Sequence, residues 1–504
     1  MKTPTDHIFQ LISSMTAAEK RYFKRHYSSD KSLITSLFDV INSQSEYNEE
    51  EVKAHFGDSK LAKNLKVYKV QLTDVLLKSL VSYHNKKSIQ SKIRMGLEEI
   101  DILMEKQLFG IAQTKVKRIK DICLKNEAYE HIFPVLATEQ YLVSFYSANQ
   151  DITKEETFKE LSSLLNAVSG IFYLQHSSHQ LSDLKNHILT NKLTKESKET
   201  YRALLKTELK KLEQGEGSIR EQYYRHHVVS MIYRMVNDDL QKENEYKSKQ
   251  VELLKNKPNF TGAYPKLYFA SLYNYLSSCW KLRKYDQLEK GIPEINSFIK
   301  EKSLLEPNYL FVYYLEISLF YVKNFEGFDE NFESKVMKHI RKHKQQTDYL
   351  ATLIYLHFAI IHMIFEQHKK VQFFLRRLSE NLNKLDAAFE PLMYIIELIS
   401  HYQSEDYAIA QNLINSHLRK QKRNPIPENN TFGEIILFFQ DLIKTPNLEE
   451  RSKKAYDFEL VKYNNMDGSL RNLLEEYGFS KWLIAVKEKS TLKDQFKSKQ
   501  NGFI

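Results

Sequence analysis

Apolar residues recur along most of the chain at the spacing of helix turns. Near the N-terminus, a capping box at Thr16 and Glu19 predicts a helix that ends near Tyr27. A longer helix is expected to begin near Ser59. Its apolar positions form one stripe, at Leu61, Leu65, Tyr68, Leu72 and Leu76. These patterns predict a compact helical head over residues 1–90.

Beyond the head, we expect helices in pairs that are joined by short polar turns. In the second half of the chain, the first residues after these turns recur at a nearly fixed interval. They are Tyr285, Phe328, His368, Tyr407 and Leu448, which lie 43, 40, 39 and 41 residues apart. A period near 40 residues is typical of helical-pair repeats.

The two helices of each expected pair differ in their apolar surface. The first is apolar nearly all round, as in 309–321, 350–365 and 392–399. The second is amphipathic, with apolar residues such as Val371, Phe374, Leu375, Leu378 and Leu382. Stacking requires this asymmetry, because the first helix is enclosed by neighbouring pairs while the second keeps one face in water. Pro293 lies inside an expected second helix and is expected to kink it or delay its start.

Two stretches place a small residue and then large apolar residues at helical spacing. They are Phe109, Ala112, Val116 and Ile119, and then Tyr407, Ala410 and Ile414. This spacing resembles the second helix of tetratricopeptide-type (TPR-like) α-solenoids, although the Trp, Leu, Gly and Tyr pattern of their first helix is absent. The resemblance covers about residues 95–460 and implies a scaffold for protein binding without catalytic residues.

The expected fold is therefore all-α, with a helical head followed by a right-handed solenoid of paired antiparallel helices and with more than about two thirds of residues in helices. We expect four segments: the head at 1–90, a first repeat segment at 91–214, a second at 215–460, and a C-terminal cap and tail at 461–504. The joint between the repeat segments is expected at Gln214 to Ser218, which holds two of the 13 glycines. The tail at 493–499 is expected to be frayed.

Composition supports this class of fold. Glycine (13) and proline (10) make up 23 of 504 residues, or about 5%. In an average chain the two together make up about 12% of residues. Sandwiches, barrels and doubly wound α/β enzymes need many more tight turns. The hydrophobic fraction of 42% provides ample core.

Charge and cysteine content indicate which partners and which cellular compartment to expect. The 74 basic and 64 acidic residues leave a net charge of +10, which permits an anionic partner but is dilute for a dedicated nucleic-acid domain. Cys123 and Cys279 form no CxxC pair and fit a reducing cytosol; Cys279 and Trp280 are expected in the core. The N-terminus lacks the apolar core of a signal peptide, and 350–365 is too short to cross a bilayer. We expect a cytoplasmic protein.

The chain has no P-loop, GxGxxG, HExxH, GxSxG or EF-hand motif, which predicts no enzyme activity and no cofactor. One candidate metal set lies within about an 80° arc of a predicted helix. It consists of His176, His179, Asp183 and His187. Leucines occupy the opposite side, so a polar helix face accounts for the pattern, and we predict no metal site.

A basic and aromatic run opens the head. Its cations, together with two from the helix near Ser59, form a candidate site for an anionic partner: Lys20, Arg21, Lys24, Arg25, Lys60 and Lys63. The short helix before Phe56 and the helix near Ser59 also have roughly the shape of a helix-turn-helix. A solvated surface is the alternative interpretation. The basic runs at 338–344 and 419–423 lie at predicted helix ends, where cations offset exposed carbonyls without any ligand.

These observations predict a non-enzymatic scaffold or adaptor that binds another protein or peptide. The alternative is a regulator associated with RNA, DNA or the ribosome through the basic head. Neither a membrane nor a small-molecule substrate is indicated. Binding to phosphates weakens steeply as salt rises and apolar peptide binding does not, so ionic strength separates the two functions.

Overall fold

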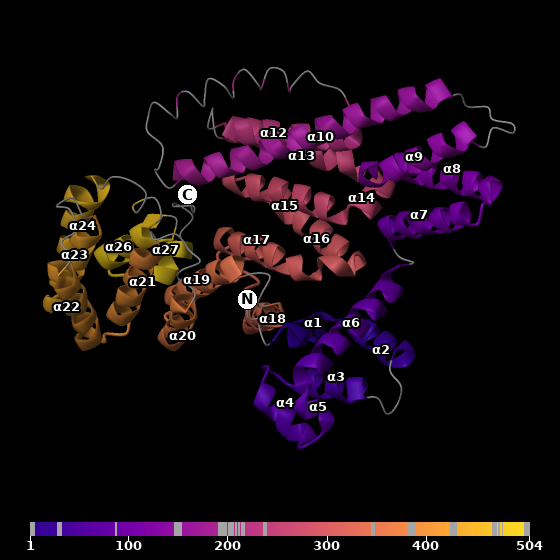
Figure 1. Cartoon of the computed structure of the whole chain (residues 1–504). Coiled ribbons are helices and arrows are strands. Elements are labelled where there is room, and N and C mark those ends of the chain that lie inside the picture. The colour runs from indigo at the N-terminus through magenta and orange to yellow at the C-terminus, as the bar shows by residue number, and fades with distance from the viewer. Residues whose placement is uncertain are drawn as a thin grey trace. The chain divides into compact units, whose positions relative to one another are not determined.

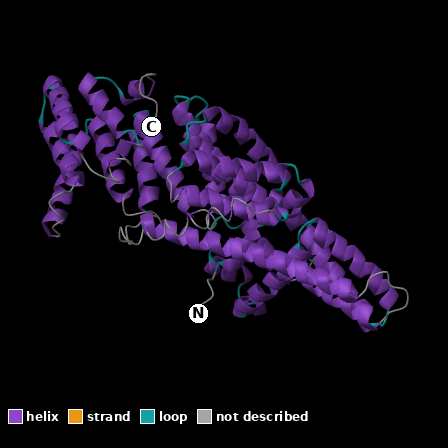
Figure 2. Ribbon diagram, turned by 90° about the horizontal axis from the view of Figure 1, so that it is seen from above, coloured by secondary structure: helices purple, strands orange, loops and turns teal. Residues whose placement is uncertain are grey.

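The computed structural model describes residues 6–27, 33–85, 88–145, 154–189, 217–234, 239–343, 348–380, 389–423, 431–465 and 477–497, with the single positions 199, 206, 209, 212, 471, 474 and 475. Of the residues described, 86% are helical and none lies in a strand (Figure 2). The all-α fold and its high helix content are thus confirmed. The chain forms two compact units, Met1–Lys284 and Tyr285–Ile504 (Figure 1). This division does not test the four expected segments, which stay a prediction.

The head of the first unit consists of short helices around one long one. They are α1 (His7–Ser14), α2 (Ala17–His26), α3 (Leu33–Ser43), α4 (Glu49–Phe56), α5 (Lys60–Lys63) and α6 (Leu65–His84). The capping box at Thr16 and Glu19 is confirmed. The single helix expected from Ser59 is wrong, because Asn64 leaves the helical conformation (φ −119°, ψ 30°) and separates α5 from α6. The Asn64 amide donates to the Lys60 carbonyl at that break.

The helix α6 carries the core of the head. Its predicted apolar stripe is buried at Leu61 (on α5), Leu65, Leu72 and Leu76, and Tyr68 is half-buried against them. Phe23 and Phe38, which are fully buried, pack together with ring centroids 4.8 Å apart. The head is therefore a small helical core of its own.

The rest of the first unit is a series of helices that pack on their neighbours in the chain. They are α7 (Ile89–Glu105), α8 (Phe109–Lys125), η1 (Tyr129–His131), α9 (Ile132–Phe145), α10 (Lys154–Leu189), α12 (Ile219–Ile232), α13 (Leu240–Lys255), α14 (Pro258–Ala263) and α15 (Pro265–Lys281). At the α7–α8 contact, a Cβ atom on Gly96 would lie 2.2 Å from Ile119 Cδ1, so any larger residue there would require the Ile119 side chain to shift. On α15, Cys279 is buried but Trp280 is only half-buried. The expected core position of Trp280 is wrong, because adjacent helical residues point about 100° apart.

A polar node in the first unit joins residues that are about 90 positions apart. The Glu127 carboxylate accepts hydrogen bonds from the backbone amides of Ile219 and Arg220, both at 2.7 Å, at the start of α12. The Arg220 guanidinium donates to Glu130 at 2.7 Å and lies over the Tyr264 ring at 5.2 Å. Glu127, Glu130, Arg220 and Tyr264, here called the Arg220 node, connect the end of α8 and η1 with α12 and α15.

The second unit repeats helix pairs in the predicted register. Its helices are α16 (Tyr285–Glu301), η3 (Ser303–Asn308), α17 (Tyr309–Val322), α18 (Glu330–Lys342), α19 (Asp348–Ile364), α20 (His368–Ser379), α21 (Phe389–Gln403), α22 (Tyr407–Arg423), α23 (Thr431–Lys444), α24 (Leu448–Val461), η5 (Tyr463–Asn465), α26 (Phe479–Glu488) and α27 (Leu492–Lys497). Four of the five register residues begin α16, α20, α22 and α24, and α18 begins two residues after Phe328. The first helices of successive pairs, α17, α19, α21 and α23, contact one another in that order.

The first helices of the second unit form its core. Along α19, Leu353 is 8% exposed and Ile360 is fully buried. None of the described helices combines the length and the apolar character that a membrane crossing requires. The late start predicted for the helix with Pro293 is wrong, since α16 runs without interruption from Tyr285 through Pro293. The loss of one amide donor is thus tolerated inside a helix whose apolar side is buried.

The C-terminal helices α26 and α27 fold back onto the face formed by these first helices (Figure 1). The Trp482 ring packs on Tyr402 of α21 and Phe439 of α23, with centroid distances of 5.6 and 4.8 Å. Phe496 of α27 contacts Phe325, which follows α17, at 5.8 Å. The frayed tail predicted for 493–499 is therefore wrong as far as Lys497, because Leu492 and Phe496 are buried; 498–499 lie outside the described residues.

A buried histidine of α19, His357, makes the second unit sensitive to acid. Burial lowers the pKa of His357 to about 4, and its Nδ1 atom lies 3.2 Å from the Tyr321 hydroxyl. The unfolded chain takes up this proton near pH 6.5, so stability is complete above that pH and is lost as pH falls toward 4. We expect His357→Gln to reduce the fall in melting temperature of the second unit between pH 6.5 and 4. Calorimetry checks this, with the transition of the first unit as internal control; identical pH profiles would contradict it.

Candidate functional site

The predicted basic residues of α2 lie beside the C-terminal end of α6. This position is set by a hydrogen bond of 2.9 Å between Tyr22 and Ser82. The Lys20 ammonium donates to the Asn42 side chain at 2.6 Å, and Lys24 pairs with Asp39 at 2.5 Å. By contrast, Arg21 and Arg25 are exposed and form no ion pair with any described residue. The α2 cluster thus contains two cations with intramolecular partners and two that face solvent.

The other two predicted cations, Lys60 and Lys63, lie on α5 at the opposite end of α6. From Leu65 to Ser82, α6 rises roughly 25 Å at 1.5 Å per residue. The structure therefore does not bring these lysines beside the α2 cluster. The helix-turn-helix hypothesis is also wrong in its second member, because α5 has only 4 residues and ends at Lys63. A single turn is too short to act as a recognition helix.

A second apolar stripe of α6 is exposed to solvent, and the sequence interpretation missed it. The α6 apolar face consists of Val67, Val70, Leu77 and Val81, which are 53, 57, 47 and 58% exposed. These steps of 3, 7 and 4 residues follow one helix face. The signal was present in the sequence, but only the stripe that contains Leu72 was recognised as structural.

The α6 apolar face ends in a shallow pocket between α2 and α6. The pocket has a volume of about 470 Å³ and is lined by Tyr27, Leu77, Lys78, Val81, Ser82 and Asn85. Lys66 and Lys78 are exposed beside the apolar residues, and exposed Asp74 lies within their row, between Val70 and Leu77. A basic margin around an apolar stripe suits an amphipathic partner with acidic side chains.

The histidine stripe of α10 does not assemble as a metal site in the described part of the chain. His176, His179 and Asp183 are exposed on α10, and the side chain of His187 lies outside the described residues. Among the described residues, these side chains do not come within metal-ligand distance of one another as a group.

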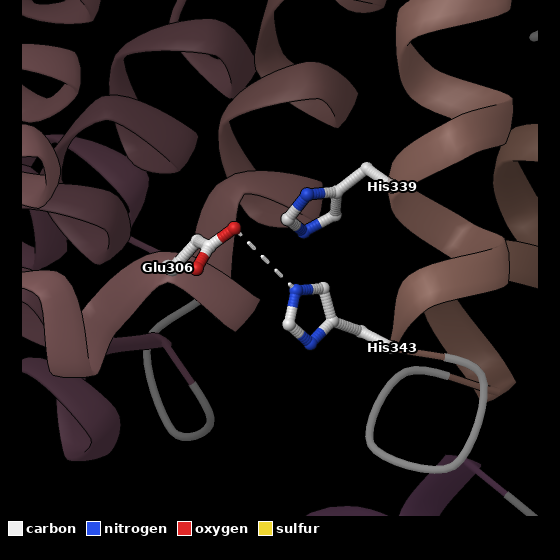
Figure 3. Close-up of side chains that lie close together, drawn as sticks. All are labelled: Glu306, His339 and His343. Atoms are coloured by element: carbon white, nitrogen blue, oxygen red, sulfur yellow. Dashed lines mark ion pairs between the residues drawn. The ribbon is translucent and has the colours of Figure 1, made fainter. Parts of the chain in front are cut away.

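A different group brings three potential metal ligands together in the second unit. Glu306 on η3 faces His339 and His343 at the end of α18 (Figure 3), and their ligand atoms all lie within 4.8 Å of one another. The His343 Nε2 atom is 3.9 Å from a Glu306 carboxylate oxygen. The two imidazole centroids are 4.6 Å apart. His339 and His343, which are four residues apart, lie inside the basic run at 338–344. The sequence interpretation assigned this run to cations at a helix end.

The environment of this group keeps both imidazoles neutral near pH 7. Burial, together with the neighbouring His343, lowers the pKa of His339 to about 4. Burial and the charge of Lys342 lower the pKa of His343. Burial raises the pKa of Glu306, but the hydrogen bond and charge of Lys342 outweigh it, and the net shift is downward. Two neutral imidazoles therefore face an ionised carboxylate. The sequence alone did not reveal Glu306, because it lies 33 positions before His339.

No model of a known protein family matches the chain, and no curated protein or solved structure is significantly similar to it. Any function must therefore be inferred from the geometry described above.

Proposed function

We propose that this protein is a non-enzymatic, TPR-like helical-repeat scaffold that binds another protein through the α6 apolar face. The exposure of Val67, Val70, Leu77 and Val81 carries this proposal. They span about 21 Å of α6, the length of a four-turn partner helix. Several exposed apolar side chains on one helix face are typical of interaction surfaces in soluble proteins.

The occupant that best fits this face is an amphipathic helix with acidic residues beside its apolar stripe. Exposed Lys66 and Lys78 flank the apolar residues, and Asp74 is the one acidic side chain between them. Acidic partner residues would meet these lysines and orient the helix. The apolar stripe would supply the affinity, with its C-terminal end entering the pocket beside Tyr27.

The packing of the second unit supports a binding face in the head rather than in the solenoid groove. In repeat proteins the stacked helix pairs form an extended concave binding surface. Here Trp482 and Phe496 of α26 and α27 lie on that surface. The buried, free cysteines Cys123 and Cys279 fit the cytoplasmic location that we propose.

The test places a photocrosslinking amino acid at Val70 in the native cell and identifies the protein that it captures. The purified partner is then titrated onto the parent chain and onto the double variant Val70→Asp, Leu77→Asp. We expect at least a tenfold loss of affinity, because each Asp places a charge in an apolar interface. The melting temperature should not change, since both side chains are about half exposed.

The matched control is Gln71→Asp, an exposed position on the same helix, and it should bind nearly as the parent does. Equal binding by the double variant would show that the α6 apolar face is not the site. Crosslinks between two copies of this chain would instead make the face a homodimer interface and would contradict a separate partner.

A second function, nucleic-acid binding, is favoured by the exposed Arg21 and Arg25 on one side of α2. The variant Arg21→Glu, Arg25→Glu tests it and leaves Lys20 and Lys24 in place beside Asn42 and Asp39. Titrations of labelled single-stranded RNA and duplex DNA at two salt concentrations should show a salt slope smaller by about 0.7–0.9 for each phosphate that the variant no longer binds. Absence of binding by the parent chain at low salt would eliminate this function.

A further inference from the structure

We propose that Glu306, His339 and His343 form a binding site for a zinc-type divalent cation in the second unit. The site is independent of the α6 apolar face, which belongs to the first unit. It would tie η3, before α17, to the C-terminal end of α18 (Figure 3).

The arrangement of the two histidines suits chelation. Residues four apart on an α-helix share one face, and two histidines at this spacing are a recurrent zinc-binding pair. His339 is the tenth residue of α18 and His343 is its C-cap. A carboxylate from a separate element, Glu306 on η3, completes a set of three protein ligands. Zinc sites with three protein ligands keep a fourth position for water.

The distances require little adjustment for a metal to enter. Ligand atoms 2.0–2.1 Å from a tetrahedral zinc ion lie about 3.3 Å from one another. The His343 Nε2 atom is now 3.9 Å from the Glu306 oxygen, so a shift of less than about 1 Å brings the pair into range. The side chain of His339 also has a second contact of the kind that orients ligating imidazoles, because its Nε2 atom lies 3.5 Å from the Pro307 carbonyl.

The chemistry of the ligands selects the class of cation. Two imidazoles and one carboxylate favour zinc and its neighbours cobalt, nickel and copper over magnesium and calcium, which prefer all-oxygen sites. Both imidazoles are buried. The Lys342 ammonium now pairs with Glu306, and a metal ion would replace this cation. Its side chain is 43% exposed, so it can move into water at the helix end.

The test uses the full chain after removal of metals with a chelator and titration with zinc, followed by cobalt. We expect one equivalent of zinc to bind and to raise the melting temperature of the second unit, because the ligands converge only when that unit is folded. Cobalt should give the visible absorption of a tetrahedral site with nitrogen and oxygen ligands. An excess of magnesium should displace neither ion.

The variants His343→Gln and Glu306→Gln should each lower zinc affinity at least tenfold and abolish the cobalt spectrum. Glu306→Gln keeps the shape of a side chain at the surface, so it remains informative if His343→Gln loses stability. The control His176→Gln removes an exposed histidine of α10 and should bind zinc as the parent does. Zinc binding that survives both variants, or a parent chain that binds no zinc at micromolar concentration, would overturn the proposal.

Discussion

Replacing Ile360 by Asp is expected to destabilise the second unit by roughly 4 kcal/mol, a large part of the about 5–15 kcal/mol that stabilises a typical domain. Ile360 is fully buried in α19, the helix enclosed by the neighbouring pairs. An aspartate there would leave water without gaining a cation or a hydrogen-bond donor. Leu353→Asp, on the same helix, should have an effect of the same kind. Thermal unfolding followed by circular dichroism and calorimetry measures both.

The control for these variants lies on the same helix. Tyr349 is 55% exposed, and Tyr349→Asp should change the free energy of unfolding by less than about 0.5 kcal/mol. If Ile360→Asp and Leu353→Asp both left the melting temperature unchanged, the repeat register of the second unit would be wrong.

Replacing Arg220 by Met is expected to destabilise the first unit by roughly 2 kcal/mol. The Arg220 side chain is 14% exposed and is the cation that faces Glu130 in the Arg220 node. The Glu130 side chain is 41% exposed, so water compensates much of its charge in the variant. The expected loss comes mainly from the hydrogen bonds that the guanidinium donates to the Glu130 carboxylate and the Glu127 carbonyl, because hydrogen bonds of charged groups contribute about 1.5–3 kcal/mol. Calorimetric unfolding of the parent and the variant at neutral pH measures the difference.

Lys159→Met supplies a matched comparison, because it breaks an exposed ion pair with Glu155 on α10. Pairs of this kind contribute less than about 0.5 kcal/mol. Equal melting temperatures for the Arg220 and Lys159 variants would show that the Arg220 node does not stabilise the unit.

The Arg220 node also affects the stability of the first unit in acid. Burial raises the pKa of Glu130, but its hydrogen bonds and Arg220 outweigh this and hold the pKa below its usual value. The stability that Glu130 contributes is therefore lost only as pH falls below about 4.5.

Features that depend on neighbouring residues could be predicted from the sequence. Thr16 and Glu19 form a cap within one helical turn. Leu448 begins a helix at the position predicted from the turn that precedes it. Asn64 is different. It interrupts a stretch whose apolar spacing is helical, and its side chain donates to the Lys60 carbonyl four residues earlier. The spacing of apolar residues does not show such a break, because it does not record side-chain hydrogen bonds to the backbone.

Features that depend on distant residues could not be predicted. The burial of Phe496 requires Phe325, and the cluster at His339 requires Glu306. No periodic pattern connects such positions. The second stripe of α6, at Val67 and Val70, was visible in the sequence, but its exposure depends on which side of α6 the other helices cover.

The return of α27 to the start of the second unit affects how this unit is made during translation. Phe325 and Phe496 are in contact, and 496 − 325 gives 171 residues of synthesis between them. At about 5–20 residues per second, the ribosome needs roughly 10–35 s to cover this distance. Within this interval, Tyr402 of α21 and Phe439 of α23 remain open to water from their own synthesis until Trp482 follows, 482 − 402 = 80 and 482 − 439 = 43 residues later. The nascent second unit therefore presents an apolar surface suited to chaperones until its last helices have emerged.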